Sequence, residues 1–139
     1  TTYRRLAESA LTKLARHFPQ AGAAWTARVA LPGGDFPHDG FAGLVENLRA
    51  AHPYLAPAHA ERLVRAYGTE ASELLGDATT AEELGRCFGA DLTEAELRWL
   101  MTREYARKAA DVVWRRSKLG LRLSAEEIAA IDAYMAEHA

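Results

Sequence analysis

Apolar residues recur every three or four positions along most of this chain, which is the spacing of one face of an α-helix. At the N-terminal end this spacing predicts a helix over residues 2–18, with Thr1 or Thr2 as its cap and Pro19 as its end. The same spacing predicts further helical segments over 41–52, 58–67, 70–75, 93–105, 111–118 and 124–135. No stretch alternates apolar and polar residues as a half-buried strand does. The predicted fold class is therefore all-α, a single compact domain of about six helices.

Residues 20–40 interrupt this helical pattern. Glycine and proline cluster in the sequence LPGGDFP at 31–37, and no helical spacing runs through it. We expect a Gly/Pro-rich connector on the surface, ordered or partly mobile. The chain then divides into a first helix (1–19), the connector (20–40) and a helical domain (41–139).

Two helix starts carry the capping-box signature, in which Ser or Thr is followed three residues later by Glu. They are Thr93 with Glu96 and Ser124 with Glu127. In each box the hydroxyl and the carboxylate accept hydrogen bonds from each other's free backbone amides. We expect capping to account for these glutamates and for their neighbours Glu94 and Glu126, in place of acid–base chemistry.

Composition limits the class of protein. The 139 residues are enough for one domain, and 49% hydrophobic with 26% charged residues is typical of a globular chain. A single cysteine, Cys87, excludes an intramolecular disulfide and a cysteine-based metal site, so a reducing, cytoplasmic setting is expected. We expect Cys87 to be a small buried hydrophobe. The chain begins with Thr1 rather than Met, and we expect a processed product or a piece of a longer protein.

Charge is distributed unevenly along the chain. Between Arg98 and Arg122 there are eight cations and two anions, a net +6, whereas the remaining residues carry a net −8. Such a segment is suited to phosphate, anionic lipid or nucleic acid, or it pairs with the acidic remainder, which is the commonest outcome. A sequence pI of about 6.2 argues against nucleic acid.

The segment 110–120 is the most distinctive part of this basic region. Asp111 and Arg115 are four residues apart, so they can pair on one helix face. Trp114 lies on the other side and supplies a large apolar area, which is either buried in the core or exposed. Tyr105 is expected on the apolar face of the 93–105 helix. Two interpretations stay open for this segment. Its cations either bind loops and carboxylates of the same chain, or they face a phosphate or a lipid headgroup. The residues concerned are Asp111, Trp114, Arg115, Arg116 and Lys118.

No residues form a recognisable catalytic or metal-binding pattern. The five histidines are scattered, with none placed four residues from another on a helix, so no metal site is predicted. The glycines at 33 and 34 lack the lysine and hydroxyl of a phosphate-binding loop. The sequence therefore predicts no catalytic residues and no independent enzyme.

Several stretches in the right order carry a resemblance to a known family. They are 92–100 (LTEAELRWL), 104–107 (EYAR), 111–120 (DVVWRRSKLG), 67–69 (YGT) with 74–75 (LL), and 1–4 (TTYR). Together they resemble the helical C-terminal domain of FAD-dependent glycerol-3-phosphate dehydrogenase, and 1–4 looks like the tail of that family's GGKxTTYR motif. The resemblance covers most of 1–19 and 52–123.

The resemblance implies a parent flavoenzyme. It would oxidise glycerol 3-phosphate to dihydroxyacetone phosphate and pass electrons through FAD to a membrane quinone, or to oxygen in related oxidases. The FAD-binding part would precede this chain and be its main partner, so residues 1–139 alone are expected to bind no FAD and to be inactive. The motif places only Thr1 and Thr2 at the edge of the FAD and substrate site, with capping alone as the alternative. It makes Arg115 and Arg116 organisers of the fold.

Other partners stay open at this stage. A free-standing helical module that binds a phosphate-bearing partner through the 98–122 arginines is the alternative function. A homo-oligomer and peripheral contact of the basic segment with the inner face of the membrane are compatible with the first interpretation.

Overall fold

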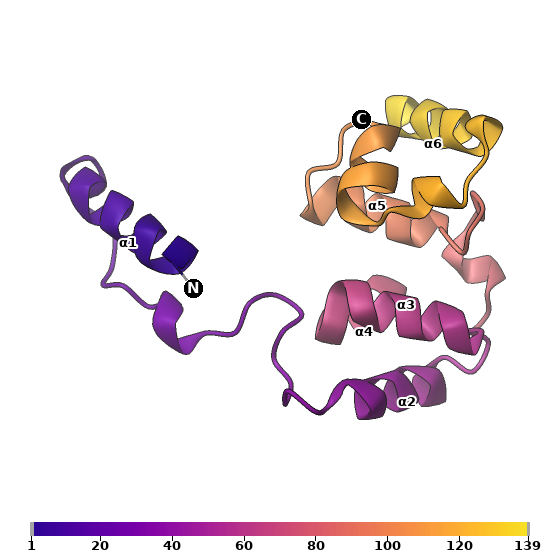
Figure 1. Ribbon diagram of the computed structural model, residues 1–139, viewed down its shortest axis with the longest axis horizontal. Coiled ribbons are helices and arrows are strands. Elements are labelled where there is room, and N and C mark those ends of the chain that lie inside the picture. The colour runs from indigo at the N-terminus through magenta and orange to yellow at the C-terminus, as the bar shows by residue number, and fades with distance from the viewer. Residues whose placement is uncertain (1, 139) are drawn as a thin grey trace.

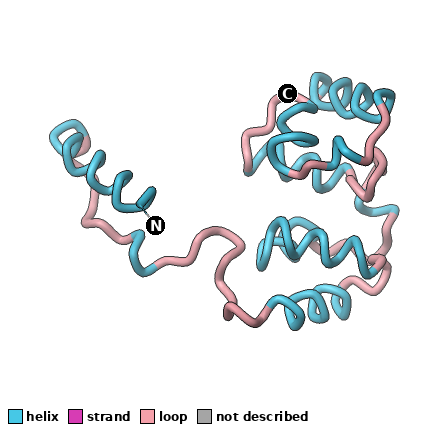
Figure 2. The backbone as a smooth tube through the Cα atoms, in the orientation of Figure 1, coloured by secondary structure: helices cyan, strands magenta, loops and turns pink. Residues whose placement is uncertain are grey.

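The computed structural model describes residues 2–138, and all regular structure in that range is helical apart from one isolated bridge between Cys87 and Thr93 (Figures 1 and 2). The α-helices are α1 (Thr2–Leu14), α2 (Phe41–Ala51), α3 (Pro57–Tyr67), α4 (Ala71–Leu75), α5 (Glu94–Arg103) and α6 (Ala125–Glu137). Short 3₁₀ turns and one π-helical segment, Asp111–Arg116, connect them. The all-α prediction is confirmed, with six α-helices in the described chain.

The molecule consists of a helical body and an arm. We call residues 2–31 the arm and 32–138 the body. In Figure 1 the arm, which contains α1, extends away from the helices of the body. No residue of α1 is buried, although its apolar residues have the predicted helical spacing. The predicted helix is therefore present, but its apolar side stays largely exposed in the described chain.

The core lies between the helices of the body. Pro57 begins α3 and Gly68 follows its last residue, as the sequence predicts. Leu63 and Val64 of α3, Leu97 of α5 and Ile131 of α6 are among its fully buried side chains. The π-helical segment adds buried valines at 112 and 113, so the basic region is anchored from its inner side.

Two glycines fix the end of the connector to the body. The Thr69 N–H donates to the Gly33 carbonyl (3.0 Å), and both Gly33 (φ +73°) and Gly68 (φ +56°) have left-handed backbones. A side chain on either residue would clash with the backbone of the other segment. The connector is therefore anchored from Gly33 onward, at the junction of α3 and α4.

Only one of the two predicted capping boxes is complete. In the box at α6 the Ser124 N–H donates to Glu127 (2.7 Å) and the Glu127 N–H donates to the Ser124 hydroxyl (3.2 Å). At α5 the Glu96 N–H donates to the Thr93 hydroxyl, but the return bond is absent from the described chain. The reciprocal capping predicted for Glu96 is wrong because its side chain points into the core.

Two expectations about side-chain burial are wrong because of local backbone geometry. Cys87 is exposed, since residues 86–94 run as a short extended pair in which alternate side chains face opposite sides and Phe88 takes the inward position. Tyr105 is 73% exposed because α5 ends at Arg103, and the left-handed backbone of Tyr105 (φ +56°) removes it from the helix face.

Candidate functional site

A buried polar cluster joins α3 to α5. Glu96 is completely buried, and its two oxygens accept hydrogen bonds from the Arg62 guanidinium, both at 2.7 Å. The Tyr67 hydroxyl also donates to Glu96 (2.8 Å). Arg62 reaches the carbonyl of Asp91 as well (2.9 Å), so the loop before α5 is tied to the same cluster. These contacts satisfy the buried carboxylate and give the cluster a structural role.

This cluster was not predicted from the sequence. Glu96 matches the capping-box signature, which accounts for the residue without reference to the core. A second signal was present, because Glu96 lies three and four residues before Trp99 and Leu100 and therefore on the apolar face of α5. Burial and the Glu96 carboxylate raise the pKa of Tyr67, which keeps its hydroxyl protonated as a donor.

One further polar side chain lies buried beside the cluster. His59, in the first turn of α3, is 9% exposed, and its Nε2 has no hydrogen-bond partner among the described residues. Burial and the nearby Arg62 charge lower the pKa of His59, against a smaller opposing effect of Glu96 and Asp91. This environment favours the neutral form of the imidazole.

Most cations of the basic region are paired with carboxylates. The ion pairs are Arg98 with Glu94 (2.6 Å), Arg103 with Glu73, Arg115 with Asp111 (2.6 Å), Arg116 with Glu104 (3.6 Å) and Arg122 with Asp91 (3.9 Å). Three of the partners, Glu73, Asp91 and Glu94, lie outside the segment itself. Much of the positive charge of the basic region is thus neutralised by carboxylates of the body.

The structure brings together the five residues singled out at 111–118. Asp111 accepts from the backbone amides of Arg107 (2.9 Å) and Lys108 (3.0 Å), and these bonds lower the pKa of its carboxyl. The Arg115 guanidinium donates to the other oxygen of Asp111 (2.6 Å). Arg116 donates to the carbonyl of Glu104 and so holds the end of α5. Asp111, Arg115 and Arg116 therefore order the turns around the π-helical segment.

The other two residues of this set, Trp114 and Lys118, lie on the outer side. The indole of Trp114 covers Gly120, where a Cβ atom would clash with the ring. Trp114 is nevertheless 41% exposed, so of the two positions left open by the sequence the structure shows the one outside the core. The reason is the wider π-helical turn, which directs Val112 and Val113 inward and leaves Trp114 outside. Lys118 adopts a left-handed backbone (φ +61°), and its ammonium donates to the Trp114 carbonyl.

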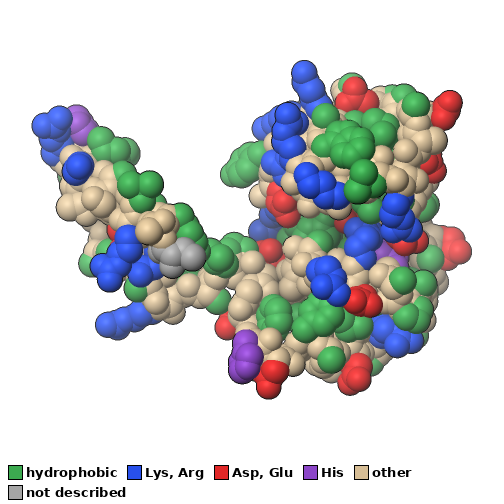
Figure 3. Space-filling model, in the orientation of Figure 1, with side chains coloured by type: hydrophobic (Ala, Val, Ile, Leu, Met, Phe, Trp, Pro, Cys, Tyr) green, Lys and Arg blue, Asp and Glu red, His purple; other side chains and the backbone are tan. Residues whose placement is uncertain are grey.

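The outer side of the basic region combines free charge with exposed apolar groups. Among residues 2–138, no carboxylate forms an ion pair with three of its cations, and three large apolar side chains are exposed beside them. We call these six residues the basic-aromatic surface: Arg107, Lys108, Lys118, Tyr105, Trp114 and Leu121. Figure 3 shows a hydrophobic patch on the upper part of the body, bordered by Lys and Arg side chains.

The arm carries a larger set of uncovered apolar side chains. The large ones exposed there are Tyr3, Leu6, Leu11, Leu14, Phe18, Trp25, Val29 and Leu31. Within the arm, the Thr26 hydroxyl donates to Glu8 (2.5 Å), which also pairs with Arg4 (3.2 Å). These bonds fold residues 15–28 back along α1 and leave the apolar residues available to a partner.

The two threonines predicted at the edge of a cofactor site lie apart from the other singled-out residues. Thr2 is the exposed first residue of α1, on the arm, and Thr1 lies outside the described residues. Within the described chain there is no group of three or more His, Cys, Asp or Glu side chains that could hold a metal ion. No helix there is long and apolar enough to cross a membrane.

Comparison with known proteins establishes the family of this chain. The family model described as the C-terminal domain of alpha-glycerophosphate oxidase matches residues 24–139. The chain belongs to this family. It is 39% identical over 140 residues to the aerobic glycerol-3-phosphate dehydrogenase of Escherichia coli and 41% identical over 139 residues to the glycerol-3-phosphate dehydrogenase of Pseudomonas aeruginosa. It is also 38% identical over 130 residues to the D-erythritol 1-phosphate dehydrogenase of Brucella abortus.

These alignments cover nearly all of the chain but only part of each relative. They include 99% of the chain for the two glycerol-3-phosphate dehydrogenases and 94% for the erythritol-phosphate enzyme. The chain spans 26–27% of the length of these relatives. The resemblance inferred from residues 67–120 and 1–4 is thereby confirmed at the level of the family.

Proposed function

We propose that this chain is the C-terminal helical part of a flavin-dependent glycerol-3-phosphate dehydrogenase. The parent enzyme would oxidise glycerol 3-phosphate to dihydroxyacetone phosphate and pass the electrons through FAD to a quinone. The observation that carries this proposal is 39% and 41% identity across 99% of the chain to two enzymes of that name. The chain itself contributes structure and contacts to the parent enzyme and has no active site of its own.

The division of the chain supports this role. Residues 1–19 would continue from the FAD-binding part, 20–40 would connect, and 41–139 would form the helical domain. The arm exposes eight large apolar side chains, and the relatives have nearly three-quarters of their length outside the matched region. An apolar surface of this extent is typical of an interface with another domain. Its proposed partner is the FAD-binding part of the same chain.

When bound, FAD would supply the redox chemistry of the parent enzyme, which is acceptance of a hydride from the substrate and transfer of the electrons. The described residues contain no G-x-G-x-x-G turn between a strand and a helix, so they do not fit a complete FAD site. Thr2 fits its edge, because it opens α1, whose first-turn amides are free to donate to an anionic group. We assign Thr1 and Thr2 only this contact, in the parent chain.

The name of the Brucella relative supports a second candidate substrate, D-erythritol 1-phosphate. Both substrates are phosphates of small polyols, and the residues that distinguish them would lie in the preceding part. The C-terminal domain alone therefore predicts only a polyol-phosphate dehydrogenase. We prefer glycerol 3-phosphate as the substrate because two of the relatives are named for it.

Complementation tests the proposal. Residues 1–139 are expressed with a FAD-binding part that ends at the GGK motif, and dye reduction is measured with glycerol 3-phosphate and with erythritol 1-phosphate. We expect co-purification, and activity only when both pieces are present. If the pieces do not associate and activity with the FAD-binding part alone is unchanged, the chain is a separate binding module.

The basic-aromatic surface favours an additional contact, with the anionic inner face of the membrane. Cations without carboxylate partners beside exposed Tyr and Trp side chains are suited to lipid headgroups. We expect flotation with anionic vesicles that weakens with salt and is reduced by the double change Lys108→Glu and Lys118→Glu. The control is Arg49→Glu on the exposed side of α2. Absence of binding at low salt would discard membrane contact and leave a soluble phosphate-bearing partner.

A further inference from the structure

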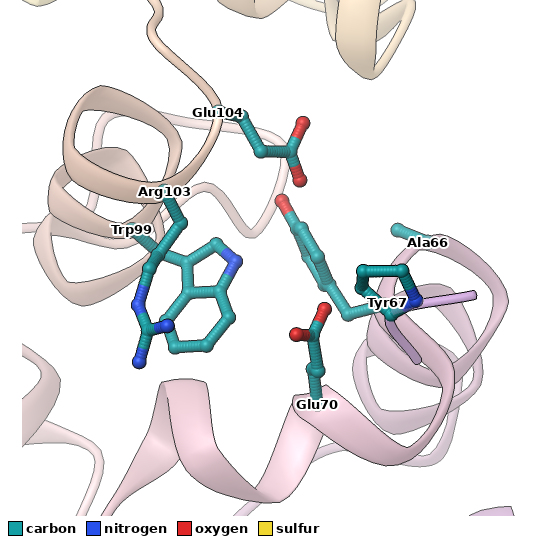
Figure 4. Close-up of a pocket in the computed structure, with 7 residues that line it drawn as sticks. Ala66, Tyr67, Glu70, Trp99, Arg103 and Glu104 are labelled. Carbon is teal, nitrogen blue, oxygen red and sulfur yellow. The ribbon is translucent and has the colours of Figure 1, made fainter. Parts of the chain in front are cut away.

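A pocket of about 370 Å³ opens where the ends of α3 and α5 face the connector. Its lining residues are Pro32, Ala66, Tyr67, Glu70, Trp99, Arg103 and Glu104. Figure 4 shows the rings of Tyr67 and Trp99 as its aromatic walls, with the carboxylates of Glu70 and Glu104 facing the same space. Neither the family match nor the proposed role accounts for this group of side chains.

The aromatic walls are fixed in place. Tyr67 is 7% exposed and is held by its hydrogen bond to Glu96, while Trp99 is 9% exposed. The Arg103 guanidinium lies 4.9 Å from the centre of the Trp99 ring and is paired with Glu73. The Arg103 cation of the same chain therefore already forms a cation–π contact with this indole.

Two polar groups that face the pocket, the Trp99 N–H and the Glu70 carboxylate, form no hydrogen bond with residues 2–138. The Trp99 side chain is nine-tenths buried, but its N–H is open to solvent through the pocket and is not a fully buried atom without a partner. Figure 4 shows this N–H turned toward the space bounded by Tyr67, Glu70 and Glu104. Glu70 forms no hydrogen bond or ion pair with any described side chain, and Glu104 reaches Arg116 only at 3.6 Å. An indole donor at the pocket surface and the Glu70 carboxylate therefore face one cavity.

We propose that this pocket binds a small organic cation, an ammonium or guanidinium group with a hydroxyl or carbonyl oxygen close to it. The carboxylates of Glu70 and Glu104 would neutralise the positive charge, and the faces of Tyr67 and Trp99 would contact its alkyl part. The oxygen would accept the Trp99 N–H. A phosphate or a carboxylate ligand would instead be repelled by both glutamates, with only Arg103, already paired with Glu73, to offset them.

Two sources can supply this chemistry. One is a free amine of low molecular weight, and the other is a Lys or Arg side chain of the parent chain's preceding part. The site itself lies wholly within this chain, so its failure leaves the proposed dehydrogenase role intact.

Nuclear magnetic resonance of the three tryptophan indole N–H groups tests the site in the full chain. Ethanolamine is the probe, and ethylene glycol, which replaces the ammonium with a hydroxyl, is the uncharged control. We expect ethanolamine to shift only the Trp99 signal, identified with Trp99→Phe, with a dissociation constant on the order of millimolar for so small a ligand. Ethylene glycol at the same concentration should leave the signal unchanged.

Variants test the role of the carboxylate. Glu70→Gln should weaken ethanolamine binding about threefold to fivefold, because it removes a partly exposed charge. Glu46→Gln, on the exposed side of α2, should leave it unchanged. Equal shifts with ethylene glycol, no saturable shift of Trp99, or unaltered binding by Glu70→Gln would overturn the proposal.

The same titration on the chain joined to its FAD-binding part distinguishes the two sources. A response of Trp99 to ethanolamine indicates a free amine. A Trp99 signal already at the bound position, without response, indicates a basic side chain of the preceding part. A signal at the unbound position without response contradicts both.

Discussion

At the residue scale, the largest energetic consequence belongs to Glu96. Its carboxylate is fully buried and accepts from Arg62 and Tyr67, so Glu96→Ala leaves a buried guanidinium and hydroxyl without their acceptor. We expect a loss of about 3–5 kcal/mol in the free energy of unfolding, measured by urea denaturation. The control is Glu61→Ala, which removes an exposed ion pair with Arg65 and should cost at most about 1 kcal/mol. Equal costs for the two variants would show that the cluster is not buried.

The neighbouring His59 predicts a dependence of stability on pH. Burial, followed by the Arg62 charge, lowers the pKa of His59 in the folded state, although Glu96 and Asp91 oppose this. In the unfolded chain His59 therefore takes up a proton near pH 6.5, whereas in the folded chain its imidazole is protonated only at lower pH. Stability due to this group is present above about pH 6.5 and is lost as the pH falls below it.

The measurement is the difference in unfolding free energy between about pH 7.5 and 5.5. We expect His59→Gln to reduce this difference, whereas His17→Gln, on the exposed arm, should leave it as in the parent chain. A slope that survives in His59→Gln would assign the pH dependence to other groups.

The two tryptophans of the body differ in burial and should therefore contribute different amounts to the free energy of unfolding. Trp99 is 9% exposed and Trp114 is 41% exposed. We expect Trp99→Ala to lower the free energy of unfolding by about 3–5 kcal/mol and Trp114→Ala by about 2 kcal/mol, because only part of its indole is removed from water. Denaturant unfolding of both variants decides the matter. A larger cost for Trp114 would contradict the outer position that the π-helical turn gives it.

At the scale of elements, the sequence predicts much of the fold. The spacing of apolar residues, Pro57 and Gly68 at the ends of α3, and the Ser124 box locate helices within a few residues. What it does not predict depends on contacts between distant segments. The inward course of Glu96 requires Arg62, which is 34 residues away. The exposure of Trp114 follows from a π-helical turn that no local sequence pattern predicts. The candidate pocket likewise joins residues from 32 to 104.

The contact between the connector and the end of α3 depends on glycine. Gly68 has a left-handed backbone, and a Cβ there would clash with the Gly33 carbonyl. Gly68→Ala should therefore destabilise the body by more than about 1 kcal/mol in urea unfolding. Gly43→Ala is the matched control, because that glycine lies within α2 with no atom near its Cβ position. It should stabilise the body by roughly 0.5–1 kcal/mol. The same sign for both variants would show that the contact tolerates a side chain.

At the scale of the whole molecule, the arm and the body differ in how far their apolar residues are covered. The body has its own core, whereas the eight large apolar side chains of the arm are 46–71% exposed. A charge placed on that apolar side should leave the body's unfolding unchanged and weaken docking to the FAD-binding part. Leu6→Asp introduces such a charge at a side chain that is 71% exposed.

We expect Leu6→Asp to lower co-purification and complemented dye reduction at least tenfold, about 1.4 kcal/mol of association free energy. Ala7→Asp adds the same charge to the adjacent, differently directed position of α1 and should retain both. Urea unfolding of residues 1–139 should be the same for the two variants, since both positions are exposed. Loss of association by both would point to charge alone. Retention by both would place the interface with the FAD-binding part on the body, because an apolar face that tolerates a buried carboxylate is not an interface.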